Sequence, residues 1–229
     1  MQATDSGMPV NAAIEGRKSI RRFRPDAVSG DTIRDILRVS SRAPSGTNSQ
    51  PWFVHVVTGG AKDKLSQSVI AAAKAGDKGD EYPYSPSPWW EPYVSRRRKV
   101  GFDLYALYGV ERHDMEGRMR AGLRNFEFFG APVGLFFTME RELLYGSWLD
   151  VGMFMENVML MARSHGLETC PQQAWCDYAH VVRRELGISD KHVIVSGMSL
   201  GYADQGAKEN TLETERVPVD EFAMFHGGV

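Results

Sequence analysis

The sequence is poor in cysteine. Its 229 residues include only two, Cys170 and Cys176, which are too few for a disulfide framework. Their spacing differs from the Cys-x-x-Cys pattern, and no nearby pair of histidines completes a zinc site. We therefore expect no bound metal and two reduced, buried thiols in a cytoplasmic protein.

Neither sign of charge dominates, and no apolar run is long. The 27 lysines and arginines nearly balance 29 acidic residues, for a net charge of -2, whereas a dedicated nucleic-acid-binding protein is usually strongly basic. The N-terminus has no basic-then-apolar signal pattern. The most apolar helical pattern, over 151–162, contains Glu156 and Asn157 and is too short to span a bilayer. We expect neither nucleic acid nor a membrane as a partner.

The sequence also contains no internal repeat and no Gly/Ser linker, so residues 1–229 are expected to form a single domain. Helical and extended patterns follow one another without regular alternation, which favours an α+β fold. Ser29 and Ser147 are the expected N-caps of two helices, and the strand over 52–57 is expected to be buried. The patterns predict helices over about 9–17, 29–43, 61–75, 94–108, 114–129, 147–166 and 178–186, and strands over 52–57, 132–138 and 192–200.

Two further segments are unusual. The helix that starts at Ser147 is apolar nearly all round, which is typical of a helix buried in a large protein or between subunits. Residues 77–92 contain four prolines among tyrosines and tryptophans, so they form neither a regular helix nor a central strand. A loop of this length is either disordered or functional, and its aromatic residues favour the wall or lid of a pocket.

Two short stretches near the start carry the main functional signal. Arg17-Lys18-Ser19-Ile20-Arg21-Arg22-Phe23 is cationic, and Ala43-Pro44-Ser45-Gly46-Thr47-Asn48-Ser49-Gln50-Pro51-Trp52 is rich in small hydrogen-bonding residues. Taken singly, the first is as well explained by a solvated helix end and the second by an ordinary turn. Together they offer fixed cations for a phosphate and close partners for a heteroaromatic edge, which indicates a flavin mononucleotide (FMN) site. The sequence contains no Gly-x-Gly-x-x-Gly turn, which is the pattern that would indicate a dinucleotide-binding site.

These stretches resemble the FMN-dependent nitroreductase family. The resemblance extends through residues 166–175, 200–202 and 215–218, and thus over nearly the whole chain from about residue 10. The C-terminal residues 216–227 are most similar to the branch that contains bacterial 4-nitrobenzoate reductases. The resemblance implies a three-layer α+β sandwich with a central mixed or antiparallel sheet. It also implies an intertwined homodimer with two FMN sites between the subunits, in which residues 205–229 wrap the partner.

The resemblance assigns roles to five residues of one subunit. Arg17 and Arg216 would hold the FMN phosphate, while Lys18 and Ser19 would line the path of the phosphate and ribityl chain. Arg21 would lie near N1 and the C2 carbonyl of the ring. A cation there would stabilise the negative charge of the reduced flavin.

Other contacts are implied from the second subunit and from the N5/O4 edge of the ring. The backbone of Gln172, Gln173 and Ala174 would face that edge. Many family members have Glu-Gly where this chain has Gln173-Ala174, so the backbone role is kept and a side-chain charge is lost. The family also often has an Asn that contacts the flavin, in the region after the second helix. Neither 77–92 nor 96–99 offers a residue for this role. The other subunit would contribute a set of small residues: Pro44, Ser45, Gly46 and Asn48.

The implied activity is the reduction of nitroaromatic or quinone-like compounds by NAD(P)H, with NADPH slightly favoured, in a ping-pong sequence at one site. No catalytic side chain is expected, because the flavin carries the hydride. The basic run over 96–99 is either a solvated helix face or a source of one arginine for a carboxylate, a nitro group or the NADPH phosphate. Two alternatives remain: a quinone, flavin or enoate reductase or reductive dehalogenase on the same fold, and a non-catalytic flavin-binding regulatory module.

Overall fold

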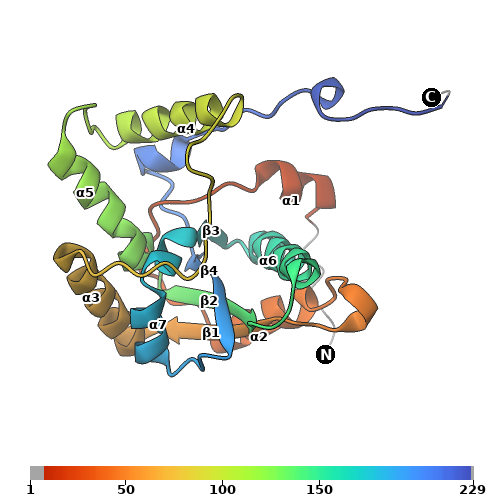
Figure 1. The fold of residues 1–229 in the computed structure, drawn as a ribbon, viewed down its shortest axis with the longest axis horizontal. Coiled ribbons are helices and arrows are strands. Elements are labelled where there is room, and N and C mark those ends of the chain that lie inside the picture. Colours follow the sequence, from red (N-terminus) through yellow and green to blue (C-terminus); the bar gives the residue numbers. More distant parts are fainter. Residues whose placement is uncertain (1–7, 228–229) are drawn as a thin grey trace.

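The computed structural model describes residues 8–227 as helices around one four-stranded sheet (Figure 1). The strand order is β1-β2-β4-β3, and every neighbouring pair is antiparallel. The strands are β1 (Phe53–Thr58), β2 (Val133–Glu140), β3 (Glu168–Gln172) and β4 (His192–Gly201). The helices are α1 (Val10–Gly16), α2 (Gly30–Ser40), α3 (Gly59–Ala75), α4 (Tyr93–Leu107), α5 (Met115–Leu123), α6 (Tyr145–Ser164) and α7 (Ala179–Leu186). Within the described residues, no helix has the length and apolar character needed to cross a membrane.

The sheet separates two hydrophobic cores, and the alternation of side chains along β2 shows why. Leu135 and Phe137 enter a core with α2 and α6, whereas Phe136 between them enters a core with α3 and α7. Helices on both faces of one antiparallel sheet make the three layers that the sequence analysis expects. The α+β prediction is therefore confirmed.

Two glycines in the central strands make room for aromatic rings of the second core. A Cβ atom at Gly134 would lie 2.2 Å from the ring of Phe128, and one at Gly197 would lie 2.4 Å from the ring of Trp175. These two rings pack against each other with centroids 4.5 Å apart. The close approach of ring to backbone therefore requires glycine at both positions.

The helix over 29–43 is largely as predicted, while the first strand is not buried. Ser29 accepts a hydrogen bond from the backbone N–H of Thr32 at 3.0 Å, so the predicted N-cap is confirmed. β1 lies at an edge of the sheet, and within it only Val57 is fully buried. The prediction of a buried strand was wrong, because a run of apolar residues does not distinguish a central strand from an edge that another surface can cover.

The helix predicted to open at Ser147 begins earlier and without that cap. α6 starts at Tyr145, and no side chain caps it. The Asp150 carboxylate, which the capping pattern would place at the helix start, instead accepts a hydrogen bond from the backbone N–H of Gly46 at 3.2 Å. A contact far away in sequence therefore overrides the local pattern.

The helix predicted over 114–129 is also shorter, and one strand was not predicted. α5 ends at Leu123, and a 3₁₀ segment follows in which Phe128 and Phe129 have φ angles of 52° and 53°. Such left-handed angles are costly for aromatic residues and end a regular helix. The overlooked strand is β3, which is only five residues long and contains Pro171. Proline is tolerated there because β3 is an edge strand.

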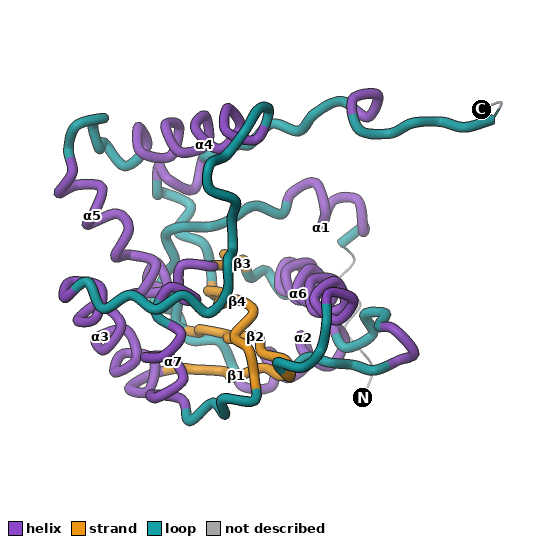
Figure 2. Tube along the Cα trace, in the orientation of Figure 1, coloured by secondary structure: helices purple, strands orange, loops and turns teal. Residues whose placement is uncertain are grey.

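The segment 77–92 is irregular, as predicted, and runs from the end of α3 to the start of α4 (Figure 2). The C-terminal segment after the 3₁₀ turn Lys208–Thr211 extends away from the body of the molecule (Figure 1). The predicted single domain covers 1–229, and the predicted C-terminal tail covers 205–229. Of these ranges, residues 1–7 and 228–229 lie outside the described residues.

Candidate functional site

The cationic stretch forms an extended segment beside the free edge of β3. Ser19 makes an isolated parallel bridge with Thr169, and the backbone N–H of Ile20 donates to the Thr169 carbonyl at 3.0 Å. Ile20 is buried in the core. Because side chains of an extended chain alternate, Arg17, Ser19 and Arg21 leave the segment on the side opposite to Ile20. Apolar burial thus fixes the direction of the three polar side chains.

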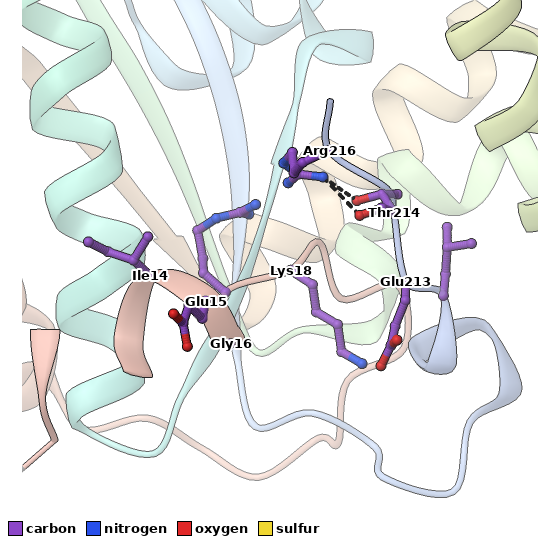
Figure 3. Close-up of a pocket in the computed structure, with 9 residues that line it drawn as sticks. Ile14, Glu15, Gly16, Lys18, Glu213, Thr214 and Arg216 are labelled. Carbon is purple, nitrogen blue, oxygen red and sulfur yellow. Dashed lines mark hydrogen bonds between the residues drawn. The ribbon is translucent and has the colours of Figure 1, made fainter. Parts of the chain in front are cut away.

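At one end of this segment lies a cavity of about 670 Å³, which we call the arginine cavity (Figure 3). Arg17, Lys18 and Arg216 line it, together with Glu15 and Glu213. The Arg17 guanidinium is 3.8 Å from a carboxylate of α6. Arg216 is exposed and, within residues 8–227, donates only to oxygens of its own tail segment, at 2.8 to 3.0 Å. Three cations predicted from distant parts of the sequence are therefore brought together.

At the other end lies a smaller cavity of about 250 Å³, the tyrosine cavity, with Arg21, Tyr105, Tyr108, Asn125 and Cys170 in its lining. It is enclosed by α4, by the segment after α5, and by β3. Burial raises the pKa of the Cys170 thiol to about 11, so this group is neutral at physiological pH. The tyrosine cavity thus combines one cation with aromatic and neutral polar groups.

Arg21 itself is held in place by two buried or half-buried side chains. The Asn210 side chain accepts from the backbone N–H of Arg21 at 2.8 Å and donates to the carbonyl of Arg22 at 2.8 Å. The guanidinium of Arg124 donates to the Arg21 carbonyl at 2.7 Å and to Glu209 at 2.9 Å. These contacts fix the backbone from which Arg21 projects.

The residues at the end of β3 have side chains that are already occupied. The Gln172 amide donates to the carbonyl of Asn125 at 2.7 Å and accepts from the Ser199 hydroxyl at 2.6 Å. The Gln173 amide donates to the Tyr82 hydroxyl and, at 3.0 Å, to a backbone carbonyl of β4. Ala174 offers no polar side chain. A ligand at this edge would therefore meet the backbone, which is the role that the resemblance implies.

The other predicted contact residues lie elsewhere in the same chain. Pro44, Ser45, Gly46 and Asn48 form a turn against α6, and none of them lines the arginine or the tyrosine cavity. Ser45 accepts from a backbone N–H five residues later at 3.0 Å, and Asn48 has a left-handed φ of 61°. One chain alone therefore does not bring this turn to the cations.

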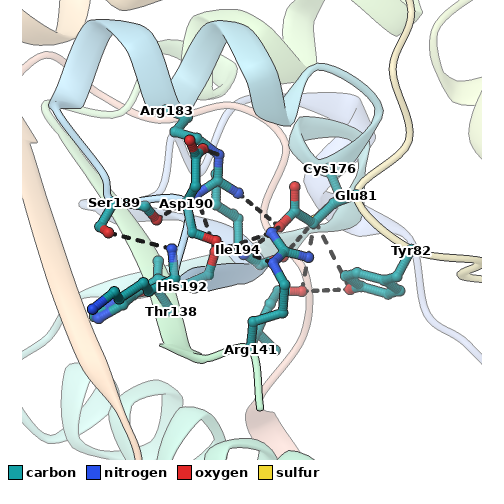
Figure 4. A network of polar contacts seen from close by, with 12 residues as sticks. Glu81, Tyr82, Thr138, Arg141, Cys176, Arg183, Ser189, Asp190, His192 and Ile194 are labelled. Carbon is teal, nitrogen blue, oxygen red and sulfur yellow. Dashed lines mark hydrogen bonds and ion pairs between the residues drawn. The ribbon is translucent and has the colours of Figure 1, made fainter. Parts of the chain in front are cut away.

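The predicted pocket loop is tied to the sheet at its beginning (Figure 4). The Glu81 carboxylate accepts from Arg141 at 2.5 Å and from Arg183 at 2.8 Å. The Tyr82 hydroxyl donates to the carbonyl of Val195 at 2.5 Å, and burial raises its pKa far above the ordinary value. The same hydroxyl accepts from Gln173, so the loop and the end of β3 are fixed to each other.

The second basic run lies on an exposed face of α4. The guanidinium of Arg97 lies 5.7 Å from the ring centroid of Trp89, and Lys99 pairs with Asp103 at 2.8 Å and with Glu215 at 3.4 Å. None of residues 96–99 lines the arginine or the tyrosine cavity. This geometry favours the interpretation as a solvated helix face.

Comparisons with known proteins agree with this geometry. Residues 14–202 match the model of the nitroreductase family, and the chain belongs to that family. It is 39% identical over 217 residues to a 4-nitrobenzoate reductase of Pseudomonas putida, covering 95% of each chain. It is 38% identical over 218 residues to a nitrobenzene nitroreductase of Ectopseudomonas oleovorans, covering 94% of this chain and 96% of the relative. The resemblance inferred from the sequence is confirmed.

Solved structures give the same result. The fold matches that of an FMN- and NADPH-dependent nitroreductase, NfnB, of Sphigopyxis sp. strain HMH, with a TM-score of 0.94 and 37% identity over 96% of this chain and all of that one. It also matches the FMN-dependent nitroreductase NfnB of Mycobacterium smegmatis, solved in complex with NADPH, with a TM-score of 0.91 and 31% identity. That match covers 95% of this chain and 97% of the other.

Sequence reasoning missed several residues that shape the two cavities. Asn125 and Tyr108 line the tyrosine cavity, and Asn210 holds the Arg21 backbone. Asn125 follows α5, whereas the sequence analysis considered only 77–92 and 96–99 for the family's flavin-contacting Asn. The sequence analysis predicts that Asn125 lies inside a helix that continues to Phe129, so nothing marked it as a residue of a cavity wall. Asn210 lies in a polar segment in which nothing indicated a long-range contact.

Proposed function

We propose that this protein is an FMN-dependent oxidoreductase that reduces nitroaromatic compounds with NAD(P)H, NADPH being the better donor. The observation that carries the proposal is the convergence of Arg17, Lys18 and Arg216 on one cavity, with Arg21 in a second cavity at the other end of the same segment. A ligand with a phosphate at one end and an aromatic heterocycle at the other matches this order. The names of the relatives support the substrate class.

The residues present fit FMN. Cationic groups gather at one end, where Arg17, Lys18 and Arg216 would hold the phosphate and Ser19 would line the ribityl path. The tyrosine cavity has aromatic walls, which Tyr105 and Tyr108 supply beside the neutral polar Asn125. When bound, FMN supplies the hydride transfer from NAD(P)H to the nitro compound.

The protein's own residues bind and tune the cofactor. Arg21 would place a permanent positive charge beside the ring, and this charge would favour the reduced state. Asn210 and Arg124 hold the backbone of Arg21, so that charge is fixed before the reaction. The neighbouring Cys170 thiol stays protonated and adds no competing negative charge. The backbone of Gln172, Gln173 and Ala174 would face the N5/O4 edge.

We further propose that residues 1–229 form one FMN-binding domain that works as a homodimer. On α6, Tyr145 is 88% exposed and Leu149 is 71% exposed, although both are large and apolar. Such an uncovered face supports burial against a second copy. The partner would then supply the turn of Pro44, Ser45, Gly46 and Asn48, which one chain leaves away from its cations. The segment 205–229 would wrap the partner, and the loop 77–92 would form a wall of the pocket.

The two cysteines support the expected cytoplasmic location, because both are buried and free. The other reductase activities considered for this fold would use the same two cavities, and no observation favours them over nitro reduction. A regulatory module would bind flavin without turning over.

The test is to purify the protein, release its cofactor by denaturation and identify it by chromatography. We expect FMN. The purified protein should then oxidise NADPH in the presence of 4-nitrobenzoate and, more slowly, oxidise NADH. Release of FAD, or no flavin after reconstitution with FMN, would contradict the cofactor assignment. Bound FMN without turnover of any nitroaromatic acceptor would support the regulatory module instead.

A further inference from the structure

The start of the pocket loop is joined to the 3₁₀ segment Gln173–Asp177, which begins where β3 ends. The backbone N–H of Gly79 donates to the Asp177 carbonyl at 2.8 Å, and that of Glu81 donates to the Cys176 carbonyl at 3.0 Å. The two segments therefore run side by side and are held by backbone hydrogen bonds (Figure 4). A change in the position of one is passed to the other.

A group of three polar partners continues this connection at the first residue of the 3₁₀ segment. The Gln173 amide donates to the Tyr82 hydroxyl and, at 3.0 Å, to the Val195 carbonyl of β4. The Tyr82 hydroxyl donates to the same carbonyl at 2.5 Å. Burial keeps the hydroxyl protonated by raising its pKa, and the Tyr82 ring packs edge-on against Trp148 of α6 with centroids 4.6 Å apart. Tyr82 is thus fixed by its ring as well as by its hydroxyl.

The Gln173 side chain is anchored at the point where the chain leaves the sheet. Gln172 is the last residue of β3 that pairs with β4, opposite Gly197. Ala174 has no polar side chain, so the Gln173 amide ties the departing backbone back to β4 and to Tyr82. In the proposed function, this backbone faces the N5/O4 edge of the flavin, and small displacements of a group at a reacting edge are costly.

We propose that Tyr82 is a positioning residue for flavin reduction, whose hydroxyl holds the Gln173 side chain and thereby the Gln173-Ala174 backbone against the N5/O4 edge. The inference rests on the proposed function and adds a residue to it. Tyr82 lines neither the arginine nor the tyrosine cavity, so it acts through Gln173. The aromatic pocket loop and the reacting edge of the cofactor are then parts of one connected unit.

Tyr82→Phe separates this role from a purely structural one. The ring still packs on Trp148, and the Val195 carbonyl keeps the Gln173 amide as a donor. The melting temperature should therefore fall by only a few degrees, and the FMN dissociation constant should stay within about twofold. Reduction of the bound flavin by saturating NADPH, followed by stopped-flow absorbance without an acceptor, should become about tenfold slower per bound flavin.

Gln173→Leu tests whether the effect passes through the amide. In this variant the Val195 carbonyl keeps the Tyr82 hydroxyl as a donor, and flavin reduction should slow by a similar factor. Adding Tyr82→Phe to Gln173→Leu should produce no further slowing, because the connection is already lost. Tyr202→Phe is the control for removing a tyrosine hydroxyl, since Tyr202 is partly buried and lines neither cavity. Its reduction rate should equal that of the wild type.

Four results would overturn the inference. Tyr82→Phe could reduce its flavin at the wild-type rate. It could lose stability and FMN together while each bound flavin still reacts normally, which would indicate a structural role alone. Its slowing could appear in full on top of Gln173→Leu, or Tyr202→Phe could slow the reaction equally. In each case the wild type still binds FMN and oxidises NADPH, so the proposed function stands. A wild type that does neither would contradict both.

Discussion

The two cavities along the edge of β3 are built in opposite ways. In the arginine cavity, Arg216 comes from an exposed tail segment, and its hydrogen bonds in the part of the chain that the structure describes are to that segment. In the tyrosine cavity, Arg21 stands on a backbone held by Asn210 and Arg124. The phosphate end of the proposed site is therefore loosely assembled, and the ring end is preorganised. This division suits an enzyme whose chemistry occurs at the ring, because positions there must be fixed to about 1 Å.

The largest expected effect comes from removing the tail beyond the arginine cavity. Truncation after Pro218 keeps Arg216 but deletes the exposed Phe222 and Phe225. We expect the dimer to dissociate and FMN binding to fall sharply, since obligate interfaces leave no stable monomer. Light scattering should change from twice the chain mass of 25.6 kDa to once that mass. A truncated protein that remains dimeric would contradict the wrapping tail, and one that is monomeric yet yellow and active would contradict the shared site.

The second prediction concerns the cation of the loose end. Arg216→Ala should weaken FMN binding by about 2 to 4 kcal/mol, because a charge-assisted contact to a phosphate is lost. The melting temperature of the flavin-free protein should barely change, since Arg216 is exposed and bonds only locally. Arg98→Ala is the control, because it removes the same charge from an exposed position on α4. Equal losses of affinity in both variants would indicate a general charge effect.

The third prediction concerns the fixed end. Asn210→Ala deletes four hydrogen bonds, to the N–H groups of Arg21 and Arg22 and to the carbonyls of Arg22 and Asp204. We expect a loss of about 2 kcal/mol in the free energy of unfolding of the flavin-free protein, because partly buried backbone groups lose their partners. Gln205→Ala, at an exposed site nearby, should change it by less than about 0.5 kcal/mol. If the Asn210 variant is as stable as the wild type, the ring end is not preorganised by this residue.

The sequence predicted the cations of both ends better than the contacts that hold the fixed end, for a physical reason. Arg17 and Lys18 belong to a contiguous cationic stretch, and Arg216 belongs to a short motif, so each carries a local signal. Asn125 and Asn210 act through contacts between distant segments, and no local pattern marks them.

The fold shows the same division. Helix caps and apolar stripes identified α2, α3 and α7 to within a few residues. The errors at α5 and α6 arose where long-range packing took over, as in the bond from Gly46 to Asp150 and the left-handed angles of Phe128 and Phe129. Local propensity is a weak prior that tertiary context overrides.

The smallest expected effect concerns the reactivity of the two cysteines, of which Cys170 lines the tyrosine cavity. Burial raises the pKa of Cys170 to about 11 and that of Cys176 to about 12. A thiol shifted from about 9 to about 11 has roughly 100-fold less thiolate at pH 8, and thiolate is the reactive form. Alkylation of the native protein should therefore be slow at both positions, whereas the unfolded protein should react fully.

Because Cys170 lines the tyrosine cavity and Cys176 does not, bound FMN should slow the labelling of Cys170 further and leave Cys176 unchanged. Mass spectrometry of the two alkylated peptides, with and without FMN, measures the difference. Equal protection of both thiols would mean that FMN acts by stabilising the whole fold, and rapid labelling of Cys170 in the complex would place the ring outside the tyrosine cavity.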